Sequence, residues 1–270
     1  MLLFDRKFGR EFLQSVPMEP GTYAFVDASG VPVYVGKAKS LRRRLGQYRR
    51  ARGGKMRKIV KAAHALTFET CGTELDACLA ELRQIQSAKP KLNIAGNFSH
   101  RYPLVGVRSE KTGFHLCFTT TPDVFPDYRF FGTFRSRYIT AEAFFGLVRL
   151  LQFIGHPIRI KREERKPYSY EFGLRRLPQT LIDSVPAFFL GQSAEFLELL
   201  VLRLLENAGA RAKAKEIQEG VDALETFWKQ ECVALARVIA ATGFETYPVL
   251  QTERDPLFVR AGFEQREETK

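Results

Sequence analysis

The segment from Gly21 to Tyr48, GTYAFVDASGVPVYVGKAKSLRRRLGQY, constrains the fold most, because its residue pattern changes period part-way along. Two runs of β-branched and aromatic residues, TYAFVD and VPVYVG, flank a turn at 28–30, which predicts a β-hairpin. Leu41, Leu45 and Tyr48 then recur at helical spacing. The segment therefore predicts two antiparallel strands followed directly by a helix.

The same part of the chain is strongly cationic. No acidic residue occurs between Ala28 and Phe68, whereas residues 37–61 contain twelve Lys or Arg, and the chain as a whole has a net charge of +12. A charge run is often only a solvated face. Here it follows a hairpin with two tyrosines, which favours a surface for an anionic ligand, and a basic surface gains affinity for nucleic acid by releasing condensed counterions.

Composition excludes several other classes of protein. No apolar run approaches the roughly 18 residues of a membrane helix, and the N-terminal segment is charged too early for a secretory signal. A basic membrane anchor would need a large apolar face, and glycines interrupt the basic run instead. The four cysteines lie far apart with no CxxC, which argues against a zinc or iron–sulfur site. We expect a cytoplasmic protein.

The predicted fold class is α+β. Residues 1–96 form the first predicted domain, a small, mainly antiparallel three-stranded sheet flanked by helices. A short helix is expected within 6–16, and a second helix and the third strand, LTFETC, follow the hairpin and its helix. Thr73 to Asp76 has the form of a capping box and opens a further helix that ends near Pro90.

Beyond residue 96 we expect three regions. The first is a middle region at 97–178, with a second hairpin up to about residue 125, a helix from Ala141 to Ile154, and a loop or linker over 161–178. Apolar residues at helical spacing then predict an antiparallel helical hairpin within 179–245, and residues 246–270 read as a polar C-terminal tail.

Seven elements of the first domain fall in a specific order. They are GTY at 21–23, YVG at 34–36, Lys37, Arg44, Tyr48, Glu81 and Asn93. Over residues 17–95 this pattern resembles the GIY-YIG nuclease domain, in the version found in the excision-repair nuclease UvrC and its shorter homologue Cho. Thr22 replaces the isoleucine of GIY, and because it alternates away from Tyr23, we expect it to affect packing more than chemistry.

The resemblance implies metal-dependent hydrolysis of a phosphodiester. Glu81 would supply a carboxylate to one divalent cation, Mg²⁺ or Mn²⁺. A two-metal site would need several convergent carboxylates, and Glu74 and Asp76 are assigned to helix capping. Arg44 would clamp the scissile phosphate, and Tyr48 lies one helical turn further on the same face.

Tyr34 is the expected general base. A phenol with a pKa near 10 is a poor base at neutral pH, so it needs help from Lys37, Arg44 or the metal. Tyr23 would orient the reacting group, and Asn93 would brace the site or its phosphate. A separate set of cations, expected to bind backbone phosphates with little sequence preference, comprises Lys39, Arg42, Arg43, Arg49 and Arg50.

The resemblance to UvrC continues more weakly past residue 95. RFFGTF at 129–134 and the helix after it are similar to the family's middle region. The family's cysteine cluster corresponds to KPYSYEFGLRRLP at 166–178, which has no cysteine, so no iron–sulfur cluster is expected. The helical hairpin lies where the family binds UvrB, but the usual signature is not recognisable, so a UvrB–DNA complex is an open candidate partner beside DNA itself.

Three functions are to be weighed. The resemblance implies the first, an endonuclease that makes one single-strand incision and, as the family does, leaves a 5′-phosphate and a 3′-hydroxyl, on the 3′ side of a lesion in nucleotide excision repair, as part of the SOS response to DNA damage. The second is a stand-alone nuclease of a mobile element, defence or recombination system. The third is a non-catalytic DNA-binding module, disfavoured because every expected active-site position is filled.

Overall fold

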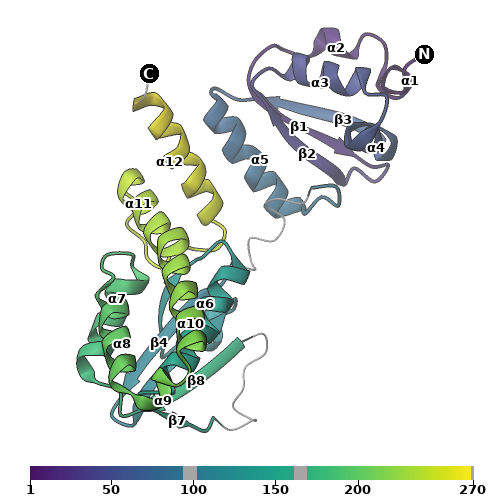
Figure 1. Ribbon diagram of the computed structural model, residues 1–270. Helices are drawn as coiled ribbons and strands as arrows, with labels where there is room; N and C mark the ends of the chain where they lie inside the picture. Colours follow the sequence, from purple (N-terminus) through teal and green to yellow (C-terminus); the bar gives the residue numbers. More distant parts are fainter. Residues whose placement is uncertain (94–101, 161–168, 269–270) are drawn as a thin grey trace. The chain divides into compact units, whose positions relative to one another are not determined.

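The computed structural model describes residues 1–93, 102–160 and 169–268 (Figure 1). The chain divides into two compact units, Met1–Ser99 with Asp255–Lys270, and His100–Arg254. This differs from the four regions expected from the sequence, because the middle region and the helices after it share one unit. In the described part of the chain, no helix is both long and apolar enough to span a membrane.

The first unit contains a three-stranded antiparallel sheet with the strand order β2-β1-β3. The strands are β1 (Gly21–Val26), β2 (Pro32–Ala38) and β3 (Ala65–Thr70). Asp27 closes the β1–β2 turn by accepting the Ser29 and Val31 amides on its carboxylate at 3.0 and 3.1 Å. The α+β fold and the hairpin predicted from the period-two pattern are confirmed.

Four helices pack on one face of this sheet: α1 (Leu3–Phe8), α2 (Phe12–Ser15), α3 (Leu41–Arg50) and α4 (Gly54–Ala62). The single helix expected within 6–16 is instead two short ones. Phe25, Leu41 and Leu45 are fully buried in the core. The apolar stripe read from α3 therefore faces the sheet, which leaves Arg42 and Arg43 exposed and Arg44 half-buried at the edge of the core.

The opposite face of β1 and β2 is covered by α5 (Glu74–Ala88). Its first turn is capped as the sequence predicts, because the Thr73 hydroxyl accepts the Asp76 amide at 3.0 Å. Cys78, Leu79 and Ile85 are buried on the inner side of the helix. Burying this stripe fixes the rotation of α5 about its axis and hence the direction of Glu81.

The second unit is built on a five-stranded antiparallel sheet, in the order β6-β4-β5-β8-β7. Its strands are β4 (Leu104–Glu110), β5 (Gly113–Thr119), β6 (Arg129–Gly132), β7 (His156–Ile158) and β8 (Ser169–Arg175). The predicted second hairpin is β4–β5, and its expected start at 97–101 lies outside the described residues. The expected loop at 161–178 is wrong for 169–175, which pair with β5 as β8; the residues at 161–168 also lie outside the described part.

Helices and one short 3₁₀ turn, η2 (Pro122–Val124), complete this unit. The helices are α6 (Arg137–Leu151), α7 (Gln179–Phe189), α8 (Glu195–Glu206), α9 (Ala208–Arg211), α10 (Ala214–Phe227), the π-helical turn η4 (Trp228–Cys232) and α11 (Val233–Thr242). The expected hairpin partner of the long second helix was α8, yet α10 packs mainly against α6. A Cβ on Gly220 would lie 3.1 Å from the Leu150 side chain, so a side chain at position 220 would crowd this helix contact.

The expected C-terminal tail also carries structure. The Thr133 hydroxyl donates to the Val249 carbonyl, and the Arg254 Nε donates to the Thr133 carbonyl at 3.1 Å. A further helix, α12 (Arg254–Glu268), follows. The low hydrophobicity of this segment concealed both features.

Replacing Thr73 with Ala should remove the cap of α5 and destabilise its first turns by about 1 kcal/mol, the usual cost of losing an N-cap side chain. Amide hydrogen exchange in α5 is the measurement. Thr73→Ser, which keeps the hydroxyl, is the control and should exchange like the native chain. Equal exchange in all three proteins would show that the cap contributes nothing.

Candidate active site

Two glycines of the GTY and YVG motifs are required by close packing. Gly36 pairs with Tyr23 across β1 and β2, and a Cβ on Gly36 would lie 2.5 Å from the Tyr23 hydroxyl oxygen. A Cβ on Gly21 would lie 2.1 Å from the Glu69 carbonyl oxygen. Real Cβ atoms do not approach other heavy atoms so closely, so both positions exclude any side chain. Gly36 therefore lets the ring of Tyr23 lie across β2, and Gly21 lets the backbone of β1 pack closely against β3.

Three tyrosines meet on this face of the sheet. The ring of Tyr23 lies 5.7 Å from that of Tyr48 and 6.4 Å from that of Tyr34, and the Tyr34 and Tyr48 rings are 6.4 Å apart. The Tyr23 and Tyr48 hydroxyls are 3.2 Å apart. Burial raises the pKa of both phenols, so both stay protonated at neutral pH. Tyr34 is the most exposed of the three, which leaves its hydroxyl the most accessible to a substrate.

Arg44 is held against this cluster. Its Nε donates to the Tyr23 hydroxyl oxygen at 3.2 Å, and its guanidinium lies 5.6 Å from the centre of the Tyr48 ring. One terminal nitrogen donates to the Gln47 side chain at 2.7 Å. Sequence reasoning missed Gln47, which its position one turn after Arg44 on α3 could have indicated. These two bonds use two of the five guanidinium N–H groups and orient the rest.

Glu81 comes from α5, which covers the face of β1 and β2 opposite the tyrosines. Its carboxyl group lies near the Lys37 backbone amide, the Lys37 ammonium and Arg44. Burial is the largest influence and raises the pKa of Glu81, while the nearby donors and positive charges oppose that rise. The Lys37 Nζ lies 2.6 Å from the sulfur of Cys78, one turn before Glu81. A buried carboxylate beside two cations is a group that a further positive charge would stabilise.

Asn93 closes the outer edge of β2. Its side-chain oxygen accepts the Val35 amide and its side-chain nitrogen donates to the Val35 carbonyl, both at 2.9 Å. The Leu92 amide donates to the Val33 carbonyl at 3.0 Å. Because an unpaired strand edge exposes hydrogen-bonding groups, these bonds act as a short substitute strand. Of the two roles expected for Asn93, this geometry favours bracing the site.

The comparisons with known proteins agree with this geometry. The family model described as the UvrC-like GIY-YIG domain matches residues 19–94. Residues 19–94 are a UvrC-like GIY-YIG domain. The UvrABC system protein C of Natronomonas pharaonis is 30% identical over 240 residues, 83% of this chain and 40% of that protein. That of Yersinia pseudotuberculosis is 27% identical over 249 residues, 86% of this chain and 40% of that protein.

A solved structure shows a further likeness. The GIY-YIG N-terminal endonuclease domain of UvrC from Thermotoga maritima, bound to magnesium, is 35% identical. The match covers 32% of this chain and 94% of that domain, with a TM-score of 0.30. This chain spans about two fifths of the length of the curated relatives named above.

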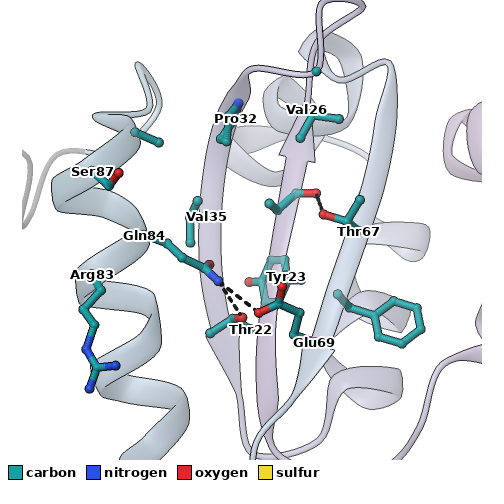
Figure 2. A pocket seen from close by; sticks show the side chains of 14 residues that line it. Thr22, Tyr23, Val26, Pro32, Val35, Thr67, Glu69, Arg83, Gln84 and Ser87 are labelled. Carbon is teal, nitrogen blue, oxygen red and sulfur yellow. Dashed lines mark hydrogen bonds between the residues drawn. The ribbon is translucent and has the colours of Figure 1, made fainter.

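The GIY-YIG domain of this chain departs from its motif at Thr22, and Figure 2 shows the consequence. Thr22 is buried on the α5 face of the sheet, and its hydroxyl accepts the Gln84 side-chain amide at 3.2 Å. The same amide lies 3.5 Å from the Glu69 carboxylate. These residues line a cavity of about 690 Å³ beside α5. Thr22 thus lies on the opposite face of the sheet from Tyr23, and its expected effect on packing more than on chemistry stays a prediction.

The cations expected to bind DNA fall into two groups. Three have partners within the protein: Lys39 pairs with Glu74 at 2.7 Å, Arg42 donates to the Val16 and Gln14 carbonyls at 2.6 and 3.1 Å, and Arg49 pairs with Asp5 at 2.6 Å. Arg43 and Arg50 are exposed and have no hydrogen bond or ion pair to the described residues. Whether any of the five contacts DNA stays a prediction.

Replacing Gly36 with Ala should destabilise the GIY-YIG domain by about 1–3 kcal/mol, the usual cost of forcing extra atoms into a packed core. It should also displace the Tyr23 ring, because the added Cβ would overlap it. Hydrogen exchange of β1 and β2 amides, with near-ultraviolet circular dichroism of the tyrosines, reports both effects. Gly53→Ala is the matched control, since a Cβ there meets no atom within 4 Å. Equal effects in the two variants would contradict the steric account.

Proposed function

We propose that this chain is a metal-dependent endonuclease that cuts one strand of DNA by hydrolysing a phosphodiester bond. The observation that carries the proposal is the convergence of Arg44, Tyr23 and Tyr48 at hydrogen-bonding distance, with Tyr34 beside them and Glu81 at the adjoining sheet edge. Hydrolysis of a phosphodiester needs groups that bind the phosphate, activate a nucleophile and stabilise negative charge. The cluster supplies one candidate for each task.

Arg44 binds and neutralises the scissile phosphate. Burial lowers the pKa of its guanidinium, but the hydrogen bond to Tyr23 and the neighbouring phenol oxygens outweigh this effect, so the pKa is raised and the group stays charged. Three of its N–H donors remain for phosphate oxygens after the bonds to Tyr23 and Gln47. Negative charge grows on those oxygens in the transition state, where a fixed, partly desolvated cation is most effective.

Tyr34, the most exposed of the three phenols, takes the proton of the attacking water, and Lys37 places its positive charge beside Glu81. Burial raises the pKa of Tyr23 and Tyr48 and keeps their protons on. They therefore act as fixed hydrogen-bonding groups that position Arg44 and the phosphate. Asn93 has a positioning role, since its amide bonds hold β2 and with it Tyr34 and Lys37.

Glu81 is the residue that would hold the metal. No cluster of three or more His, Cys, Asp or Glu side chains suited to a metal occurs in the described ranges. That donor set does not fit a metal that requires an all-protein cage, but it fits Mg²⁺, which often uses one or two carboxylates, water and substrate phosphate. When bound, the ion would supply Lewis-acid stabilisation of charge on the phosphate.

The repair assignment rests on where the similarity extends. The match to UvrABC system protein C covers 83% of this chain, well beyond the GIY-YIG domain at 19–94. A stand-alone nuclease of a mobile element or defence system would need to share only the catalytic domain. We therefore place the incision in nucleotide excision repair, on the 3′ side of the lesion, with DNA as substrate and a UvrB–DNA complex as a candidate partner.

A plasmid-nicking assay tests the catalytic assignment. With Mg²⁺ the native chain should convert supercoiled plasmid to the open circle. Arg44→Ala and Glu81→Gln should each lower the rate by about 10²-fold or more, the usual loss when one charge-stabilising group is removed. Glu74→Gln, on the same helix as Glu81, is the control; its exposed pair with Lys39 contributes little, so its rate should stay within about twofold. If both active-site variants nicked the plasmid at the native rate, the assignment would be refuted. If the native chain nicked neither plasmid nor UvrB-loaded lesion DNA, the result would favour a binding module.

Metal binding without DNA should weaken as pH falls, and at a higher pH than for an ordinary glutamate, whose pKa is about 4.3. The reason is that burial raises the pKa of Glu81, so protons compete with the cation earlier. Titration with Mn²⁺ by electron paramagnetic resonance measures this, and Glu81→Gln should abolish the effect. Affinity that stays constant down to about pH 4.3 would contradict it.

The same raised pKa has a consequence for stability. Since folding raises the pKa of Glu81, the buried carboxylate destabilises the metal-free chain above the unfolded pKa of this group. At neutral pH without metal, Glu81→Gln should therefore unfold at a higher temperature than the native chain, and the difference should shrink as pH falls through the raised pKa. Calorimetry across this pH range checks both points.

A further inference from the structure

A small cleft of about 270 Å³ lies beside Tyr48 in the first unit. Residues from α1, α3, the loop after α3 and α4 line it, including Arg6, Tyr48, Arg49, Arg52, Arg57 and Val60. Four of its side chains are guanidinium groups, and no acidic residue is among those that line it. A concave surface with this lining is suited to an anion.

The four arginines are not equivalent. Arg49 donates to both oxygens of Asp5, at 2.6 and 3.0 Å. This pair lowers the pKa of Asp5 and ties α1 to α3, which brings the neighbouring Arg6 to the cleft. Arg49 is therefore a structural residue of the wall and has little remaining charge to offer a ligand.

Arg6, Arg52 and Arg57 are exposed at the cleft, and their side chains make no hydrogen bond or ion pair to the residues that the structure describes. Three uncompensated charges at one small cleft repel each other, which is unfavourable unless an anion lies between them. Guanidinium groups also match the geometry of phosphate oxygens, to which they donate in pairs. The three side chains together form what we call the arginine cleft.

Tyr48 links the arginine cleft to the catalytic cluster. It is one of the residues that line the cleft, while its hydroxyl lies 3.2 Å from that of Tyr23 and its ring lies 5.6 Å from the Arg44 guanidinium. The two cationic sites therefore share Tyr48 as a common wall. Phosphates follow each other along a DNA strand at about 3.4 Å of helix rise, so a strand that is held at Arg44 and continues past Tyr48 brings its next phosphates toward the cleft.

We propose that the arginine cleft of Arg6, Arg52 and Arg57 binds a backbone phosphate that flanks the phosphodiester held at Arg44, and so sets the path of the cut strand. This inference rests on the proposed nuclease function. It assigns the flanking contact to arginines that the sequence did not single out for DNA binding. Two members of the set that the sequence did single out, Arg42 and Arg49, are bonded within the fold instead. The contact is to phosphate, so it adds affinity and direction without sequence preference.

The test is the salt dependence of DNA binding by the full chain, in EDTA so that no cleavage occurs. Binding of a short labelled duplex is followed by fluorescence anisotropy from low to high salt. The logarithm of the affinity falls with the logarithm of the salt concentration, and each lost phosphate contact makes this negative slope shallower by about 0.9. The double variant Arg52→Ala/Arg57→Ala loses the one phosphate contact proposed for the cleft, so its slope should be about 0.9 shallower than that of the native chain.

Two further variants separate a specific contact from general charge. Lys58→Ala/Lys61→Ala removes two charges from α4 outside the cleft and should keep the native slope. Arg52→Lys/Arg57→Lys keeps the charges and should also keep the slope, because counterion release depends on charge. A native slope in Arg52→Ala/Arg57→Ala, or an equal loss in the Lys58 and Lys61 variant, would overturn the proposal. If the double alanine variant does not fold by circular dichroism, Arg52→Gln/Arg57→Gln, which keeps side chains of similar length, should make the slope about 0.9 shallower instead. An unchanged slope in that variant would equally overturn the proposal.

A kinetic comparison distinguishes failure of this inference from failure of the nuclease proposal. In the nicking assay, Arg52→Ala/Arg57→Ala should raise KM and leave kcat within about twofold, since the flanking contact is made equally in the ground and transition states. A native chain that binds DNA through the cleft but never nicks would refute the nuclease function alone. A native chain that nicks while the cleft variant keeps both its slope and its KM would refute the cleft alone.

Discussion

The candidate site depends on the close contact between the Tyr23 ring and the backbone at Gly36. With no side chain on Gly36, the ring of Tyr23 lies across β2, and its hydroxyl reaches Tyr48 and Arg44 on α3. The same pairing sets the register of β1 and β2 and so fixes which residues of β2 face α5. Because a strand alternates its side chains, Tyr34 is held on the tyrosine face and Lys37 on the face of α5. A single steric condition therefore positions groups on both sides of the sheet.

The tyrosine cluster of the candidate site and the hydrophobic core share side chains. Tyr23 and Tyr48 are almost fully buried in the same core as Phe25 and Leu45. Burial raises the pKa of both phenols and keeps them neutral, which suits groups that orient a cation and do not exchange protons. Glu81 illustrates the cost of such an arrangement, because a carboxyl group placed for a metal is unfavourably buried without one. Stability and function therefore compete at Glu81 and cooperate at the tyrosines.

Sequence patterns predicted the elements whose local residue pattern matches the pattern of buried and exposed side chains in the structure. The β1–β2 hairpin, α3 and the cap of α5 follow from alternation, helical spacing and Thr73, each of which acts over a few residues. Contacts between distant segments were not predictable in this way. β8 is irregular in sequence and is a strand because β5 pairs with it. Glu231 is a further example: it sits in a π-helical turn, and its carboxylate accepts the Arg135 and Ser136 amides at 2.6 and 2.8 Å, capping α6 from 95 residues away.

The cationic residues show why charge counts and charge positions give different information. The run between Ala28 and Phe68 contains no acid, so its arginines find few carboxylates nearby in sequence. Arg49 obtains one from Asp5 in α1, and Arg42 instead donates to backbone carbonyls, so both serve the fold. Arg52 and Arg57 lie in the same run, and no carboxylate in the described residues reaches them. Solvent and counterions screen their charge in the free chain, and under our proposal a phosphate backbone that passes Arg44 displaces those counterions. Folding therefore pairs some arginines of the run within the protein and leaves Arg52 and Arg57 exposed at the cleft that Tyr48 also lines.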